Sequence, residues 1–118
     1  MGNKLKRIGL LGGTFDPIHN GHLGLAEKTI QLFDLQRVLF IPASRSPHKL
    51  HFQPSASADR VAMLQLALEG RAIFSVELLE IARNGISYTI DTITQLINQH
   101  PDWELFLILG ADTFGEMD

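Results

Sequence analysis

The stretch from Gly12 to His22 constrains this chain more than any other part of it. It runs Gly-Gly-Thr-Phe-Asp-Pro-Ile-His-Asn-Gly-His, between an apolar run, Ile8 to Leu11, and a segment of helical periodicity that begins near Leu23. This order predicts a buried strand, a glycine-led turn and the start of a helix. Two adjacent glycines let the backbone approach an anion closely, and a helix start presents unpaired amides, so we expect a phosphate site here.

Two histidines strengthen that prediction. His19 and His22 are three residues apart and therefore share one face at the helix entrance. There, imidazoles could hold phosphate oxygens as negative charge shifts in a transition state. Neither of the two common phosphate fingerprints, G-x-x-x-x-G-K-[ST] and G-x-G-x-x-G, is present in the stretch. The prediction therefore depends on the histidine pair.

A metal site remains a competing interpretation of the same stretch. His19, His22 and Asp16 could together bind a metal ion and make the protein a hydrolase. No obvious general-base carboxylate stands beside the pair, which counts against this interpretation. Asp16 precedes a proline, a position typical of turn formation, and we favour that structural role over direct metal contact.

Strands and helices alternate along the rest of the chain. We expect strands at Ile8–Leu11, Val38–Ile41, Ile73–Val76 and Leu105–Leu109. We expect helices from about Leu23 to Phe33, from Ser57 or Asp59 to Gly70, and from Ser87 or a neighbour to just before Pro101. We expect a turn at Arg83-Asn84-Gly85. The alternation predicts a single α/β domain over residues 1–118, with a doubly wound, Rossmann-like parallel sheet. Ligands of such sheets bind at the carboxyl ends of strands, so the segments after strands one, two and four should converge.

Composition narrows the class of protein. The chain has 118 residues and no cysteine, which excludes disulfides and thiolate metal sites. Its apolar runs fall well short of the roughly 18 to 20 residues of a membrane span, so we expect a soluble cytoplasmic protein with no membrane partner. Up to Arg60 there are eight Lys or Arg against four Asp or Glu, and beyond it two against nine. This asymmetry predicts a local anion site, whereas a nucleic-acid partner would require a broader basic surface.

A basic segment without periodicity follows the second strand. Residues 42–57 include Arg45, His48, Lys49 and His51, and a connection of this length in a compact domain is usually functional or disordered. Its basic residues favour the functional interpretation. Arg45, His51 and Arg60 receive no definite role, and a solvated position stays open for each. Trp103 is expected to precede the fourth strand and to serve in packing.

The motifs carry a resemblance. The eleven residues from Gly12 to His22 resemble the signature of the nucleotidyltransferase superfamily that shares a His-x-Gly-His motif. Ser46-Pro47-His48-Lys49, Ser87-Tyr88-Thr89 and Gly110-Ala111-Asp112 are similar, in the same order, to elements of the bacterial nicotinate-nucleotide adenylyltransferases. Pantetheine-phosphate adenylyltransferases usually carry Thr where His19 stands, and cytidylyltransferases usually lack the Pro-His-Lys and Ser-Tyr-Thr elements. These and other members of the superfamily remain the alternatives.

The resemblance implies adenylyl transfer from ATP to nicotinate mononucleotide, giving deamido-NAD and pyrophosphate in NAD biosynthesis, with Mg²⁺ bound through the ATP phosphates. It implies catalytic roles for His19, His22 and Lys49. It implies ATP contacts at Gly12, Gly13, Thr14, Phe15, His19, Gly21, His22, Gly110 and Asp112. It implies contacts to the nicotinate nucleotide at Thr14, Phe15, Lys49, Tyr88 and Thr89.

The chain also departs from that family. The family continues into a fifth strand and an Ile-Ser-x-Thr-x-x-Arg element that grips ATP phosphates, and neither is found in these 118 residues. The chain therefore resembles an N-terminal portion, and a non-catalytic nucleotide-binding fragment is a further alternative. The fourth strand would be left as an apolar sheet edge, which predicts homo-oligomers or poor solubility.

Overall fold

The structure is a computed structural model that describes residues 5–15, 18–43, 57–83 and 89–108. Its elements are β1 (Lys6–Gly13), α1 (Asn20–Phe33), β2 (Arg37–Pro42), α2 (Ser57–Leu68), β3 (Phe74–Val76), α3 (Leu79–Arg83), α4 (Thr89–Gln99) and β4 (Trp103–Ile108). Among these residues no helix is both long and apolar enough to cross a membrane.

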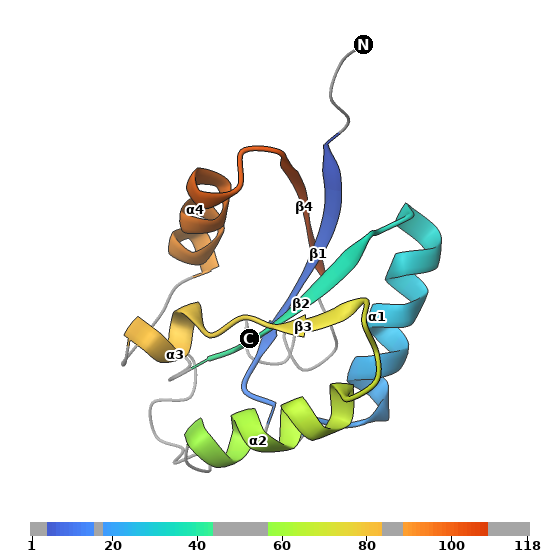
Figure 1. Cartoon of the computed structure of the whole chain (residues 1–118), viewed down its shortest axis with the longest axis vertical. Helices are drawn as coiled ribbons and strands as arrows, with labels where there is room; N and C mark the ends of the chain where they lie inside the picture. The colour runs from blue at the N-terminus through green and yellow to red at the C-terminus, as the bar shows by residue number, and fades with distance from the viewer. Residues whose placement is uncertain (1–4, 16–17, 44–56, 84–88, 109–118) are drawn as a thin grey trace, which may run out of the picture.

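The described strands form one parallel sheet in the order β3-β2-β1-β4. The chain winds from β1 outward to β3 and then returns to the other side of β1, where it adds β4. Figure 1 shows α1 and α4 on opposite sides of the sheet. This arrangement confirms the predicted doubly wound α/β fold, and the strand order reverses beside β1, where such folds bind their ligands.

The core has one layer on each face of the sheet. Residues of α1 and α2, among them Ala26 and Leu64, pack with one face of the strands, and Leu96 of α4 packs with the other. Because both faces are covered, β1 and β2 are apolar along most of their length. Gly9 lies where the first layer is tightest, since a Cβ there would sit 2.8 Å from Leu35 Cδ1. A larger residue could not pack at this position without moving its neighbours.

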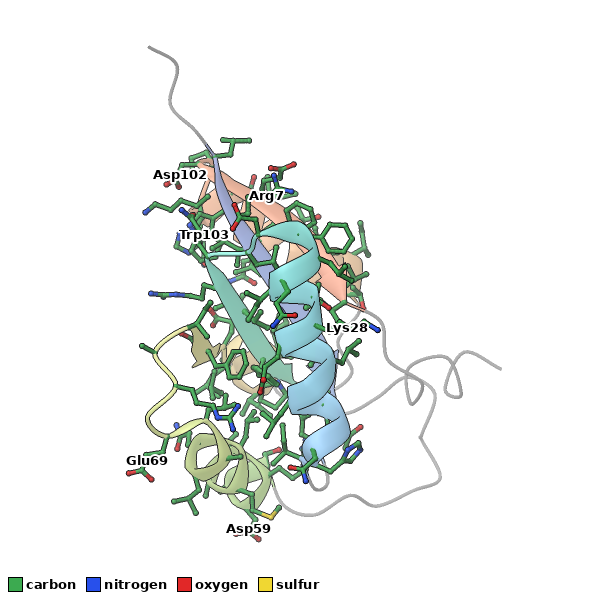
Figure 2. The ribbon with its side chains drawn as sticks, turned by 90° about the vertical axis from the view of Figure 1, so that its right-hand side faces the viewer. Arg7, Lys28, Asp59, Glu69, Asp102 and Trp103 are labelled. Carbon is green, nitrogen blue, oxygen red and sulfur yellow. The ribbon has the colours of Figure 1, made fainter. Side chains whose placement is uncertain are left out.

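The two ends of the sheet differ in character. Figure 2 shows Arg7, Asp102 and Trp103 together at one end and Asp59 of α2 at the other. At the first end the ring of Trp103 stacks on His100, with centroids 3.6 Å apart and planes 5° from parallel. The carboxyl ends of β1 and β2 lie at the end where α2 begins.

Two expectations about the elements were wrong in detail. The helix expected from Leu23 begins at Asn20, three residues earlier, because the preceding residue caps it. Trp103 is the first residue of β4 and does not precede it, although it packs on the second core layer as predicted. The fourth strand, predicted to be an apolar sheet edge, lies at the edge among the described strands, and its Leu107 is 48% exposed.

One helix was not expected at all. The helix α3 has five residues, which is too few for a hydrophobic period to appear in the sequence. It ends at Arg83, the first residue of the predicted turn, and the other two residues of that turn lie outside the described residues.

Candidate functional site

The site is built on the carboxyl ends of two neighbouring strands. Gly13 of β1 pairs with Pro42 of β2, and the amide of Ala43 donates to the Gly13 carbonyl at 2.9 Å. The residues directly after these two strands, Thr14 and Ala43, therefore lie side by side, and the rest of the segment after β2 lies outside the described residues. On the other side of β1, Ile108 of β4 pairs with Leu11, and the residues that follow it lie outside the described part.

Phe15 fixes the turn that follows β1. Its backbone has φ = 51°, in the left-handed region, and its side chain is only 2% exposed. The ring lies against Gly13, where a Cβ would be 3.6 Å from its Cζ, and meets the edge of the His22 ring at a centroid distance of 5.0 Å. The buried ring holds the residue in a conformation that bulky side chains seldom adopt.

Gly12 and Gly13 do not form the turn that was predicted for them. Gly12 and Gly13 end the strand and do not form the turn, and neither has a positive φ. The left-handed residue of the turn is Phe15. A Cβ at Gly12 would come no closer than 3.9 Å to another heavy atom, the carbonyl oxygen of Ile41. A side chain at position 12 would therefore fit without a clash, so packing within the fold does not require a glycine there.

His19 and His22 cap α1 reciprocally. The Nδ1 atom of His19 accepts from the amide of Gly21 at 3.1 Å, and the Nδ1 atom of His22 accepts from the amide of His19 at 3.1 Å. The two rings lie 3.8 Å apart between centroids. The pair was predicted to share a face of the helix entrance, and this geometry confirms it. The capping also satisfies amides that a helix start otherwise leaves unpaired.

This capping determines which ring nitrogen of each histidine is the donor. Because Nδ1 accepts in both rings, the neutral imidazoles of His19 and His22 carry their protons on Nε2. The helix thus holds two N–H donors in one fixed pair at the positive end of its dipole. Preorganised N–H donors at a helix N-terminus belong to the kind of group that stabilises anionic oxygens in enzymes.

Gly21 makes room for this pair. A Cβ at this position would lie 2.9 Å from His19 Cε1 and 3.0 Å from His19 Nδ1, closer than real Cβ contacts allow. Any larger residue at Gly21 would push the His19 ring away from the helix start. The glycine of the His-x-Gly-His motif is therefore required by the histidine two residues before it.

Arg60 is the residue that sequence reasoning missed. It lies on α2 and is 1% exposed, so a solvated position, which had stayed open for it, is wrong. Its guanidinium donates to the carbonyls of Thr14 at 2.8 Å and Ala43 at 2.7 Å. The signal in the sequence is its spacing, four and eight residues before the buried Leu64 and Leu68.

The other predicted site residues divide into two groups. Thr89 is the first residue of α4 and is exposed, which agrees with the helix start predicted nearby. Asp16, Arg45, His48, Lys49, His51, Tyr88, Gly110 and Asp112 lie outside the described residues. Among the residues that are described, no three His, Cys, Asp or Glu stand together as a metal site would need.

Comparison with known proteins agrees with the family that the sequence motifs resemble. Residues 10–117 match the family model described as cytidylyltransferase-like. Curated relatives include a probable nicotinate-nucleotide adenylyltransferase of Geobacter sp. (strain M21), 48% identical over 94% of this chain and 51% of its own length. Another, from Halalkalibacterium halodurans, is 47% identical over 92% of the chain and 53% of its own length, and carries the same name. The chain thus spans about half the length of the curated relatives it matches.

Solved structures share the fold. The nicotinic acid mononucleotide adenylyltransferase of Plasmodium falciparum, solved as complexes with APC and with NaAD, matches with TM-scores of 0.76 and 0.78 at 19% identity. Each match covers 94% of this chain, and 54% and 55% of the respective solved chains. At this identity the likeness concerns the fold alone. With the family model covering nearly the whole chain, the protein belongs to the cytidylyltransferase-like family.

Proposed function

We propose that this protein carries the N-terminal part of an adenylyl-transfer site that joins ATP to nicotinate mononucleotide, giving deamido-NAD and pyrophosphate in NAD biosynthesis. The observation that carries the proposal is the reciprocal capping of α1 by His19 and His22, which fixes both rings at the start of the helix that follows the β1 turn. The name shared by the curated relatives favours this acceptor over pantetheine phosphate.

The proposed reaction needs no nucleophile from the protein. An oxygen of the acceptor's phosphate attacks the α-phosphorus of ATP, the bond from that phosphorus to the α,β-bridging oxygen breaks, and pyrophosphate leaves with the electron pair. Catalysis then consists of placing the two substrates in line and stabilising the charge that shifts onto the leaving group. Two fixed imidazole donors at a helix N-terminus, His19 and His22, suit the second task.

The remaining roles follow the family resemblance. Gly12 and Gly13 would admit phosphate and ribose, and Lys49 would supply a further cation. Thr14 and Phe15 would contact both substrates, Gly110 and Asp112 would contact ATP, and Tyr88 and Thr89 would receive the nicotinate ring. Mg²⁺ would arrive with ATP, bound through its phosphates, so we treat it as part of the substrate.

Pyrophosphate release tests the proposal. The chain would be assayed with MgATP and, in separate reactions, nicotinate mononucleotide, its amide counterpart and pantetheine phosphate. Because the chain spans about half of its relatives, the same assay would use a fusion of this chain to the C-terminal half of the Geobacter relative. We expect turnover with the nicotinate acid and little with the other two. Turnover with pantetheine phosphate instead would overturn the acceptor, and ATP binding without turnover in both forms would identify a nucleotide-binding module.

His22→Ala is the sharpest single substitution for this proposal. Removing one preorganised donor of this kind typically costs about 10²- to 10³-fold in kcat, and we expect a loss of that size. His100→Ala is the matched control, because His100 stacks on Trp103 at the opposite end of the sheet. Wild-type kcat in the His22→Ala protein would contradict the assignment.

A further inference from the structure

Arg60 connects three segments of the candidate site at the carboxyl ends of β1 and β2. One nitrogen of its guanidinium, Nη1, donates to Thr14 O at 2.8 Å and to Ala43 O at 2.7 Å, and the other, Nη2, donates to Ser57 Oγ at 3.0 Å. Thr14 follows β1, Ala43 follows β2, and Ser57 begins α2. A single buried side chain therefore ties both strand ends to the start of a helix.

The position of these bonds along the sheet is informative. Among the described residues, the last backbone hydrogen bond between the two strand ends runs from the Ala43 amide to the Gly13 carbonyl, at 2.9 Å. The two carbonyls that accept from Arg60, those of Thr14 and Ala43, each belong to the residue directly after a strand. Arg60 thus adds a side-chain connection between β1 and β2 beside that backbone bond.

An arginine suits this place better than a lysine would. The two protons of Nη1 reach two carbonyls while Nη2 reaches a third acceptor, and the planar guanidinium fixes the angles between these bonds. A lysine has a single side-chain nitrogen on a flexible chain, so it cannot replace the bonds of both Nη1 and Nη2 with the same geometry. The separation of the strand ends is therefore set by the shape of one rigid group.

We propose that Arg60 is a positioning residue for adenylyl transfer: by bridging Thr14 and Ala43 it sets the spacing between the turn that carries Phe15 and the carboxyl end of β2. The turn is linked to the catalytic pair directly, since the Phe15 ring touches the His22 ring. Arg60 itself is 1% exposed and acts through these neighbours. The inference rests on the proposed function for its kinetic part and on the structure alone for its geometric part.

The test compares matched substitutions at two arginines. Arg60→Met removes every donor at similar length, and Arg60→Lys keeps the charge but not the fork. Arg71→Met and Arg71→Lys are the controls, because Arg71 also bonds a neighbour, Glu27 at 2.8 Å, but is 43% exposed and lies after α2. The kinetic readouts are kcat, corrected for the folded fraction measured by urea unfolding, and the KM for ATP and nicotinate mononucleotide.

The geometric readout is hydrogen exchange at single amides of the 118-residue chain. Ala43 reports the bond between the strand ends, and Val38 of β2, whose amide donates to Ile73 O at 3.0 Å, serves as an internal reference. In Arg60→Met we expect exchange at Ala43 to rise about tenfold relative to Val38, as a local opening requires. This measurement does not depend on turnover, so it decides the bridging role even if the proposed reaction fails.

For the kinetics, we expect Arg60→Met to lower kcat about 10²-fold with ATP KM changed by less than about threefold, because misplacement of the reacting groups acts mainly on the chemical step. Arg60→Lys should recover only part of that loss, and the Arg71 variants should match the wild type. The inference is overturned if kcat is unchanged after correction for folding, if Arg60→Lys behaves as the wild type, or if Ala43 exchange does not respond.

Discussion

At the scale of the residue, Gly21 and His19 depend on each other. The His19 imidazole occupies the space in which a Cβ of residue 21 would stand, 2.9 Å from its Cε1. The same helix contains a second glycine, Gly24, around which no atom comes within 4 Å of a Cβ position. The two glycines thus have the same secondary structure and opposite surroundings, which makes them a natural pair for comparison.

We expect Gly24→Ala to raise the free energy of unfolding by up to about 1 kcal/mol, because alanine is a better helix former than glycine. The free energy of unfolding of Gly21→Ala should be about 1–2 kcal/mol lower than that of Gly24→Ala, because displacement of the His19 ring removes a helix cap. Urea unfolding of the two variants measures the difference. In the active form of the protein, Gly21→Ala should also lower kcat by tenfold or more, and equal behaviour of the two variants would refute the role given to Gly21.

At the scale of the element, α3 and α4 are held together by a small polar network. The hydroxyl of Thr92, which is 2% exposed, donates to Glu80 at 2.6 Å and accepts from Arg83 at 2.8 Å. Arg83 also donates to Gln95 at 2.8 Å. One buried hydroxyl thus satisfies an acceptor and a donor of α3 together. Without this hydroxyl, the Glu80 carboxylate and the Arg83 guanidinium would each lose a hydrogen bond in a partly buried setting.

Thr92→Val should therefore lower the free energy of unfolding by about 1–3 kcal/mol, although valine has nearly the same shape. Thr94→Val is the control: Thr94 lies on the same helix, is exposed, and bonds only the Ile90 carbonyl of its own helix among the described residues. That change should fall within about 0.5 kcal/mol of the wild type. Equal losses in both variants would show that the hydroxyl of Thr92 has no special role.

Much of the architecture could be predicted because it depends on local pattern. The strands around Leu10 and Leu39 are continuous apolar runs, and the helix of Ala26 and Ile30 has clear periodicity, so their order already specified a parallel α/β sheet. The histidine pair was found by its spacing alone. These features need only neighbours in the sequence to be recognised.

The rest depends on contacts between distant residues. Arg60 and Thr14 are 46 positions apart, and only the folded chain brings the guanidinium to that carbonyl. The left-handed backbone of Phe15 could not be expected from its residue type, because it exists only where burial of the ring compensates for it. Likewise, the pairing of β4 with β1 joins residues far apart in the chain, such as Ile108 and Leu11.

At the scale of the whole molecule, the sheet ends at β4 among the described strands. β4 runs beside β1 along six residues, and its outer side offers backbone donors and acceptors next to Leu107, which is 48% exposed. An edge strand with an exposed apolar side chain favours pairing with another chain. We therefore expect the 118-residue chain to self-associate through β4, with an average mass that rises with concentration.

Leu107→Lys tests this expectation, because a charge on an edge strand opposes pairing of sheets. Multi-angle light scattering over a range of concentrations should show a shift toward the monomer in this variant. Leu66→Lys is the control, since Leu66 is 70% exposed on α2 and lies away from the β4 edge. If the wild-type chain is a monomer at every concentration, or if both variants reduce association equally, then β4 is not the contact and the edge must be protected by other means.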